Sequence, residues 1–192
     1  MELLPFLRTQ VRANRLANHR LHAAMAGLSD EEFQAKRTSF FPSLQATLQH
    51  ILAVDLYYLA GLHGEADMAA QWDRAPACLT IGELIPHQAA ADERFIAHLE
   101  SLSPPNLDDT IALDRGEGRI QRDRRGNVIA HLVNHQVHHR GQVHAMLSGT
   151  AIKPPQLDEF LMPSEAHLRT ADLAALGWTE SQIFDGQHLP HP

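Results

Sequence analysis

The chain has 192 residues, 44% of them hydrophobic, and is therefore long enough to bury one sizeable core. Its formal net charge of -7 argues against a nucleic-acid-binding protein that depends on phosphate contacts. The single cysteine, Cys78, excludes an intramolecular disulfide, and no apolar run approaches the roughly 20 residues that span a bilayer. Because the chain also starts without a signal-peptide pattern, we expect a cytoplasmic protein with no membrane and no nucleic-acid partner.

The first half of the chain predicts two long helices. Apolar residues recur at helical intervals over residues 3–25, which indicates an amphipathic helix. Ser29 and Glu32 then have the spacing of a capping box and predict a short turn of helix. Residues 43–62 are apolar on nearly every face, with Asp55 as the one charged residue, so this second long helix should be buried.

Two further long helices follow, separated by an extended segment. Thr80 and Glu83 form another predicted capping box, and the helix after them should continue to about Leu102. Residues 109–120 place β-branched residues around a Gly-Glu-Gly turn, which fits a small hairpin or an extended excursion. The last long helix should begin between positions 123 and 127 and end at Leu147.

The C-terminal part of the chain predicts shorter helices. Residues 164–176 look helical, and Thr179 with Gln182 could cap one last turn. The expected fold is therefore all-α: a four-helix bundle over residues 1–150 and a C-terminal helical extension over residues 151–192, packed on the bundle.

Arginines cluster in the segment before the last long helix. They are interleaved with acidic residues, so the pattern favours a solvated loop over a nucleic-acid surface. The arginines are Arg115, Arg119, Arg122, Arg124 and Arg125.

The last long helix carries a ladder of histidines spaced by four residues, His131, His135 and His139. On a helical wheel, His139 lies nearest the apolar centre and His135 is next, while His131 and His138 lie toward the edge. Side chains four residues apart on a helix are about 5–6 Å apart at Cβ, so two imidazoles can converge on one ion. Without a partner, burying two neutral imidazoles would cost roughly 1–3 kcal/mol per group, which favours a metal ligand pair over an inert one.

A third ligand should come from another helix, because two histidines leave a divalent ion under-coordinated. His50 lies in the most apolar segment of the chain, where an imidazole without a partner is hardest to explain. Periodicity does not select it, since that helix is apolar on most faces. The candidates that remain open are His19, His22, His50, His87 and His98.

Two motifs resemble a known family. LQHILAVDLYYL at residues 48–59, followed by NHQVHHRGQVHAML at residues 134–147, is similar to the DinB/YfiT-like family of helical metal-binding proteins, over roughly residues 1–150. The resemblance implies an up-down-down-up four-helix bundle, commonly a homodimer. It also implies a zinc or nickel site whose ligands fall on His50, His135 and His139.

The rest of the second motif is His138, Arg140 and Gln142, to which the resemblance assigns no settled role. We expect Arg140 to pair with a carboxylate and to orient the bundle or a dimer rather than to act in catalysis. No catalytic residue is assigned.

Three functions are compatible with such a site, whose three protein ligands leave a coordination position open. The first is an enzyme that uses a low-molecular-weight thiol to transfer a group to a small-molecule substrate or to isomerise it. The resemblance implies this function, because relatives of the family include thiol-dependent transferases and isomerases. The second is a hydrolase, with Asp55, Glu83 or His138 as base, although residues 136–138 lack an HExxH-like glutamate. The third is a non-enzymatic, stress-associated metal-binding protein.

Overall fold

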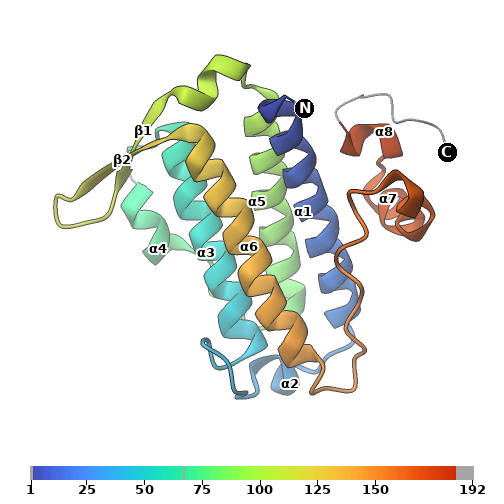
Figure 1. Cartoon of the computed structure of the whole chain (residues 1–192). Helices are drawn as coiled ribbons and strands as arrows, with labels where there is room; N and C mark the ends of the chain where they lie inside the picture. The colour runs from blue at the N-terminus through green and yellow to red at the C-terminus, as the bar shows by residue number, and fades with distance from the viewer. Residues whose placement is uncertain (1, 67, 185–192) are drawn as a thin grey trace.

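The structure, a computed structural model, describes residues 2–66 and 68–184 (Figure 1). It is mostly helical, with one small two-stranded sheet. Helix α1 packs against α5 and α6, and α3 packs against the same two helices. The four long helices are α1 (Leu3–Met25), α3 (Leu44–His63), α5 (Ile81–Glu100) and α6 (Arg125–Leu147).

Shorter elements connect the long helices and follow them. The predicted short helix after Ser29 and the predicted C-terminal helices are confirmed, whereas η1 and α4 have no counterpart among the predicted elements. The shorter elements are α2 (Asp30–Gln34), η1 (Met68–Ala70), α4 (Gln71–Arg74), η2 (Pro104–Asp108), β1 (Thr110–Asp114), β2 (Ile120–Arg124), η3 (Pro163–Leu168), α7 (Thr170–Leu176) and α8 (Glu180–Ile183).

Side-chain caps define where two of the four long helices, α3 and α5, begin. The Ser43 hydroxyl accepts a hydrogen bond from the backbone N–H of Ala46 at 3.0 Å, and this bond starts α3. Gly64 ends the same helix in the left-handed conformation that glycine tolerates, with φ of 68°. The predicted capping box of Thr80 and Glu83 is confirmed at the start of α5, with both of its hydrogen bonds present.

The excursion predicted for residues 109–120 is a β-hairpin, and its second strand extends further than expected. Strand β1 pairs antiparallel with β2, and Leu113 lies opposite Gln121 in the register. Leu113 and Ile111 are buried, and β1 contacts α3. Strand β2 ends at Arg124, so α6 begins without a connecting loop.

The prediction that the arginine cluster is solvated is only partly right. Three of its members, Arg119, Arg122 and Arg124, are exposed. Arg115 is half-buried and donates a hydrogen bond to the Tyr58 hydroxyl at 2.9 Å, because the hairpin folds back onto α3. Arg125 donates to the carbonyl oxygen of Leu62 at 3.1 Å and so joins the start of α6 to the end of α3.

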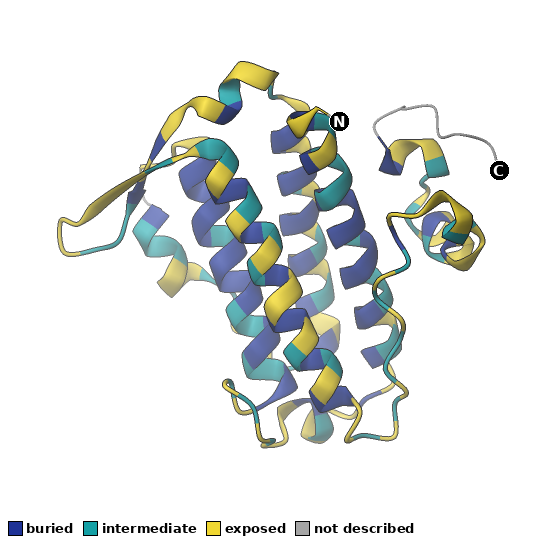
Figure 2. Ribbon diagram, viewed as in Figure 1, coloured by how far each residue is buried: buried dark blue, intermediate teal, exposed yellow. Residues whose placement is uncertain are grey.

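The main core lies between the four long helices, where their inward faces are buried (Figure 2). Burying each large aliphatic side chain contributes about 1.5–3 kcal/mol. A second, smaller core lies on the outer side of α1, where Leu16 and Ala17 meet Phe160, Leu173 and Ile183.

Ion pairs also connect α1 with the C-terminal segment. Arg20 pairs with Glu159 and with Asp172, each at 2.8 Å. Arg169 is fully buried and pairs with Glu180. Residues 185–192 of the predicted extension lie outside the described residues. Within the described part of the chain, none of the helices combines the length and apolar character that a bilayer crossing requires.

Candidate metal centre

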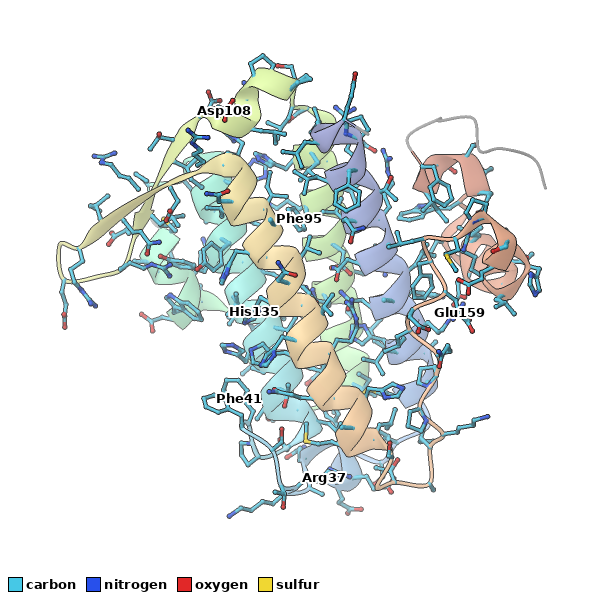
Figure 3. The ribbon with its side chains drawn as sticks, in the orientation of Figure 1. Arg37, Phe41, Phe95, Asp108, His135 and Glu159 are labelled. Atoms are coloured by element: carbon cyan, nitrogen blue, oxygen red, sulfur yellow. The ribbon has the colours of Figure 1, made fainter. Side chains whose placement is uncertain are left out.

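Three histidines from two helices meet at the contact between α3 and α6. His50 comes from α3, His135 and His139 come from α6, and one ring nitrogen of each lies within 4.8 Å of the others. The Nε2 atoms of His50 and His135 are 3.0 Å apart. Figure 3 shows His135 at the junction of the two helices, with Phe41 nearby.

The helical wheel predicted the order of burial along α6 correctly. His139 is 7% exposed and His135 is half-buried, whereas His131 and His138 are exposed. The spacing of four residues places the His135 and His139 rings side by side, with centroids 4.4 Å apart. His131 is further from His135, at 6.3 Å, and lies outside the cluster.

Gln142 orients one of the three rings. Its side-chain oxygen lies 2.8 Å from Nδ1 of His139. Because that oxygen can only accept, Nδ1 carries the proton, and the lone pair of His139 is on Nε2. The second sequence motif assigned no role to Gln142, and this contact indicates that Gln142 orients the His139 ring.

The three imidazoles are held in their neutral form. Burial, together with the neighbouring His139, lowers the pKa of His50 to about 4. Burial and the surrounding histidines lower the pKa of His135 to about 3, and burial also lowers the pKa of His139. A neutral imidazole is the form that binds metal, so the cluster is ready to bind an ion at neutral pH.

The cluster fits a metal ion better than it fits a purely structural role. Nε2 of His135 faces Nε2 of His50 rather than a carboxylate or a carbonyl group, and Nδ1 of His135 is buried without a hydrogen-bond partner among the described residues. Two nitrogens bound to one tetrahedral zinc ion are about 3.3 Å apart, close to the spacing between His50 and His135. Within residues 2–66 and 68–184, this is the one group of three or more ligating side chains close enough to share an ion.

The other candidates for a third ligand lie elsewhere. His22 is buried in α1, His19 is half-buried on the same helix, and His87 is exposed on α5. The His98 ring contacts His63, with centroids 4.7 Å apart, rather than the cluster. Of the five open candidates, only His50 lies in the cluster.

The side chains considered as a general base are engaged or exposed. Asp55 is fully buried, and burial together with Asp92 raises its pKa well above the usual value. The Glu83 carboxylate accepts hydrogen bonds from the backbone at the start of α5. His138 is exposed, with its ring 4.8 Å from His139.

A buried polar network lies inside the bundle beside the cluster, and the sequence patterns did not predict it. Arg140 donates to the side-chain oxygens of Asn14, at 2.6 Å, and Asn18, at 2.9 Å. The expected direct pairing of Arg140 with a carboxylate is therefore wrong, because Asn18 stands between it and Asp92 and donates to that carboxylate at 3.1 Å. The network consists of Asn14, Asn18, Asp55, Gln88, Asp92, Gln136 and Arg140.

One aromatic side chain covers part of the cluster. Phe41, in the segment between α2 and α3, lies against His50 with ring centroids 4.3 Å apart, and its centroid is 5.6 Å from that of His139. Its neighbour Phe40 is 80% exposed. An apolar ring therefore keeps water from one side of two of the histidines.

Comparisons with known proteins identify the family and the fold. The sequence profile of the DinB family matches residues 5–172. Protein DinB of Bacillus subtilis (strain 168) is 24% identical over 155 residues, which are 77% of this chain and 89% of that protein. The crystal structure of a DinB-like protein from Bacillus cereus ATCC 10987 superimposes with a TM-score of 0.59 and 16% identity, covering 76% of this chain and 91% of that one. That structural likeness concerns the fold alone.

Proposed function

The chain belongs to the DinB family, and from that membership we propose that it binds one divalent metal ion through His50, His135 and His139 and uses it to activate a low-molecular-weight thiol. The observation that carries the proposal is the convergence of three neutral imidazoles from two helices. Zinc or nickel is the expected ion, because both accept imidazole ligands.

The charge of the ligand set suits a thiol, although the same charge would also activate a bound water. Three neutral imidazoles leave the charge of a divalent ion uncompensated, and such an ion, when bound, would stabilise a thiolate at neutral pH. The protein's own residues would hold and orient the site: Gln142 fixes the ring of His139, and Phe41 keeps water from one side. With three protein ligands, a coordination position remains for the thiol.

Hydrolysis is the weaker alternative. It needs a base beside the open position, but Asp55 is bonded within the buried network and Glu83 caps α5. His138 is the one candidate of the three that remains accessible, although it lies on the exposed side of α6. A metal-binding protein without turnover is the third possibility, which the experiment below separates from the first two.

The proposal includes an architecture finer than a mostly helical fold. We propose an up-down-down-up bundle over residues 1–150 with residues 151–192 as an extension, and a homodimer as the family resemblance implies. Three contacts support the helix directions. Arg8 at the start of α1 donates to the Leu99 carbonyl at the end of α5. Arg125 joins the start of α6 to the end of α3, and Gln45 at the start of α3 donates to the Cys78 carbonyl, just before α5.

Metal analysis of the freshly purified protein tests the first half of the proposal. We expect about one zinc or nickel ion per chain, and none after treatment with a chelator. A purified protein that contains no divalent metal and takes up none when it is offered would contradict the metal site.

Cobalt substitution tests the second half. Cobalt-loaded protein titrated with small thiols should develop a sulfur-to-metal charge-transfer band, whereas alcohols of the same shape should not produce one. If no thiol produced the band and the protein cleaved ester substrates, the result would favour the hydrolase. If neither the thiol titration nor the ester assay gave a signal, the remaining function would be that of a metal-binding protein without turnover.

A further inference from the structure

A pocket of about 230 Å³ lies between the hairpin and helices α3 and α6, on the same side of the bundle as the histidine cluster. The pocket lies next to that cluster, because His131 lines the pocket and is one turn of α6 from His135. The polar residues that line it are Tyr58, Arg115, Gln121, Asp123, Asn127 and His131. The volume is below the roughly 300–1,000 Å³ of sites that enclose a drug-sized ligand, so the pocket fits one end of a molecule.

The hairpin register explains why these side chains face the bundle. Residues directly opposite each other in an antiparallel pair point to the same face. Gln121 lies opposite Leu113, and Asp123 lies opposite Ile111. Because Leu113 and Ile111 are buried against the bundle, Gln121 and Asp123 lie on the same face and line the pocket, whereas Arg122 between them lies on the opposite face; Gln121 is exposed and Asp123 is half-buried.

The pocket holds one positive and one negative side chain that do not neutralise each other. The Gln121 side-chain oxygen accepts from Nε of Arg115 at 2.9 Å, and its amide nitrogen donates to Asp123. The amide therefore stands between the two charges as a spacer. Among the described residues, neither Arg115 nor Asp123 forms an ion pair.

Arg115 is also held in place by aromatic side chains. It donates to the Tyr58 hydroxyl at 2.9 Å, and its guanidinium carbon is 5.5 Å from the Tyr57 ring centroid and 5.4 Å from that of Tyr58. A guanidinium fixed in this way is pre-organised to donate hydrogen bonds to a carboxylate. The half-buried Asp123 offers the matching acceptor for an ammonium group.

We propose that this pocket binds the amino-acid end of a small peptide ligand, with the ligand's α-carboxylate on Arg115 and its α-ammonium on Asp123. The other end of the ligand would reach the histidine cluster, a part of the inference that rests on the proposed function. The helix between Asn127 and His135 rises about 12 Å, and the helix between His131 and His135 about 6 Å. An extended peptide of two to three residues spans about 7–11 Å, which falls within that range.

Calorimetry with S-methylglutathione tests the pocket apart from the metal. This probe has a γ-glutamyl end with both charged groups but no free thiol, and it is titrated into chelator-treated full-length protein. We expect saturable binding that weakens about tenfold in Arg115→Gln and in Asp123→Asn, since each removes one charged hydrogen-bonding group. The matched control is Arg122→Gln, on the same strand but facing outward, which should bind like the wild type.

A ligand-variant cycle keeps the test valid if Arg115→Gln disturbs the hairpin. N-acetylation of S-methylglutathione removes the ammonium, and we expect it to weaken binding to the wild type but not to weaken binding to Asp123→Asn any further. Binding that depends on Arg115 but is indifferent to both Asp123 and N-acetylation would mean a simple anion site and overturn the proposal. No saturation at tens of millimolar, or equal binding by all variants, would also overturn it.

Metal content of the same preparations separates the two proposals. Protein that takes up metal but fails the peptide titration would leave the metal site standing and overturn the pocket. Protein that passes the peptide titration but takes up no metal would support the pocket and contradict the metal-dependent function.

Discussion

The histidine cluster and the buried polar network are neighbours along α6, where His135 and Gln136 are adjacent, yet they arrange their polar groups in opposite ways. In the network, each side chain bonds to another side chain of the network, as Arg140 does to Asn14 and Asn18, although Nδ2 of Asn14, Oδ1 of Asp55 and Oε1 of Gln88 have no partner among the described residues. In the cluster, three imidazoles face one another, with two Nε2 atoms 3.0 Å apart and Nδ1 of His135 without a partner among the described residues.

The two regions also differ in charge. At neutral pH the network balances its charges, because Arg140 stays protonated with a pKa of about 10 and Asp92, with a pKa of about 6, is ionised. The three histidines are neutral and have no opposite charge among them. A region that joins a guanidinium and a carboxylate through amide groups is suited to a structural role, whereas a cluster of neutral imidazoles with no carboxylate among them is suited to bind a cation.

The largest expected effect tests the structural half of this comparison. Arg140→Met should lower the free energy of unfolding by about 3–5 kcal/mol, because it leaves the buried Asp92 charge without compensation. Urea unfolding of chelator-treated protein measures it, with the exposed Arg122→Ala as a control expected to stay within about 0.5 kcal/mol. A loss below about 1 kcal/mol for Arg140→Met would mean that the network contributes little to stability.

The second largest expected effect tests the metal-binding role of the histidine cluster. His135→Ala should weaken metal binding by at least about 100-fold, since loss of a direct ligand should exceed the 10- to 100-fold typical of residues that only support a ligand. Stability without metal should change by less than about 1 kcal/mol, because the half-buried ring has an unsatisfied nitrogen to lose. Competition with a chromogenic chelator measures the affinity, and the exposed His131→Ala is the control. Equal losses in both variants would contradict the ligand assignment.

A third prediction uses the opposite pH dependence of the two regions. Burial, opposed mainly by the Asn18 amide, raises the pKa of Asp92 to about 6, whereas an unfolded aspartate ionises near pH 3.8. Between these values the folded chain binds more protons, so this carboxyl makes the protein less stable as pH rises from 4 to 6. The lowered pKa of His50 and His135 acts in the other direction: stability falls as pH decreases from 6.5 toward 4.

Unfolding of chelator-treated Asp92→Asn and wild type at pH 4, 5, 6 and 7 separates these contributions. We expect the stability of the variant, relative to the wild type, to rise by roughly 1–3 kcal/mol between pH 4 and pH 6 and then to level off. Curves that run parallel over the whole range would show that the folded and unfolded states release this proton at the same pH.

The two regions also differ in how far the sequence predicted them. The wheel for α6 placed His139 and His135 nearest the core because that helix has one apolar arc, and the order of burial agrees with it. His50 could not be selected in the same way, since α3 is apolar on most faces and has no distinctive stripe. Only its burial and the family resemblance favoured it.

The network was missed because its members look like surface residues in the sequence. Asn14 and Asn18 lie among arginines on α1, and Gln88 and Asp92 are four residues apart on α5. They become buried because all four helices contribute a polar side chain to the same level of the bundle, a match that no single helix reveals. The half-buried position of Arg115 was missed for the same reason, since it depends on contact between the hairpin and α3.

The smallest effect concerns the boundary of the cluster. Phe41→Ala removes the ring that lies against His50, an interaction of about 0.5–1.5 kcal/mol, so metal affinity should fall by no more than about tenfold while chelators extract the ion several-fold faster. Phe40→Ala is the matched control, because Phe40 is 80% exposed and, among the described residues, its ring contacts only the ring of Phe41, edge to face. If Phe41→Ala abolished metal binding as completely as His135→Ala, the cluster would depend on packing from outside to hold its rings together. The histidines on α3 and α6 would then not be pre-organised by the helices alone, and the contrast with the hydrogen-bonded network would be deeper than proposed.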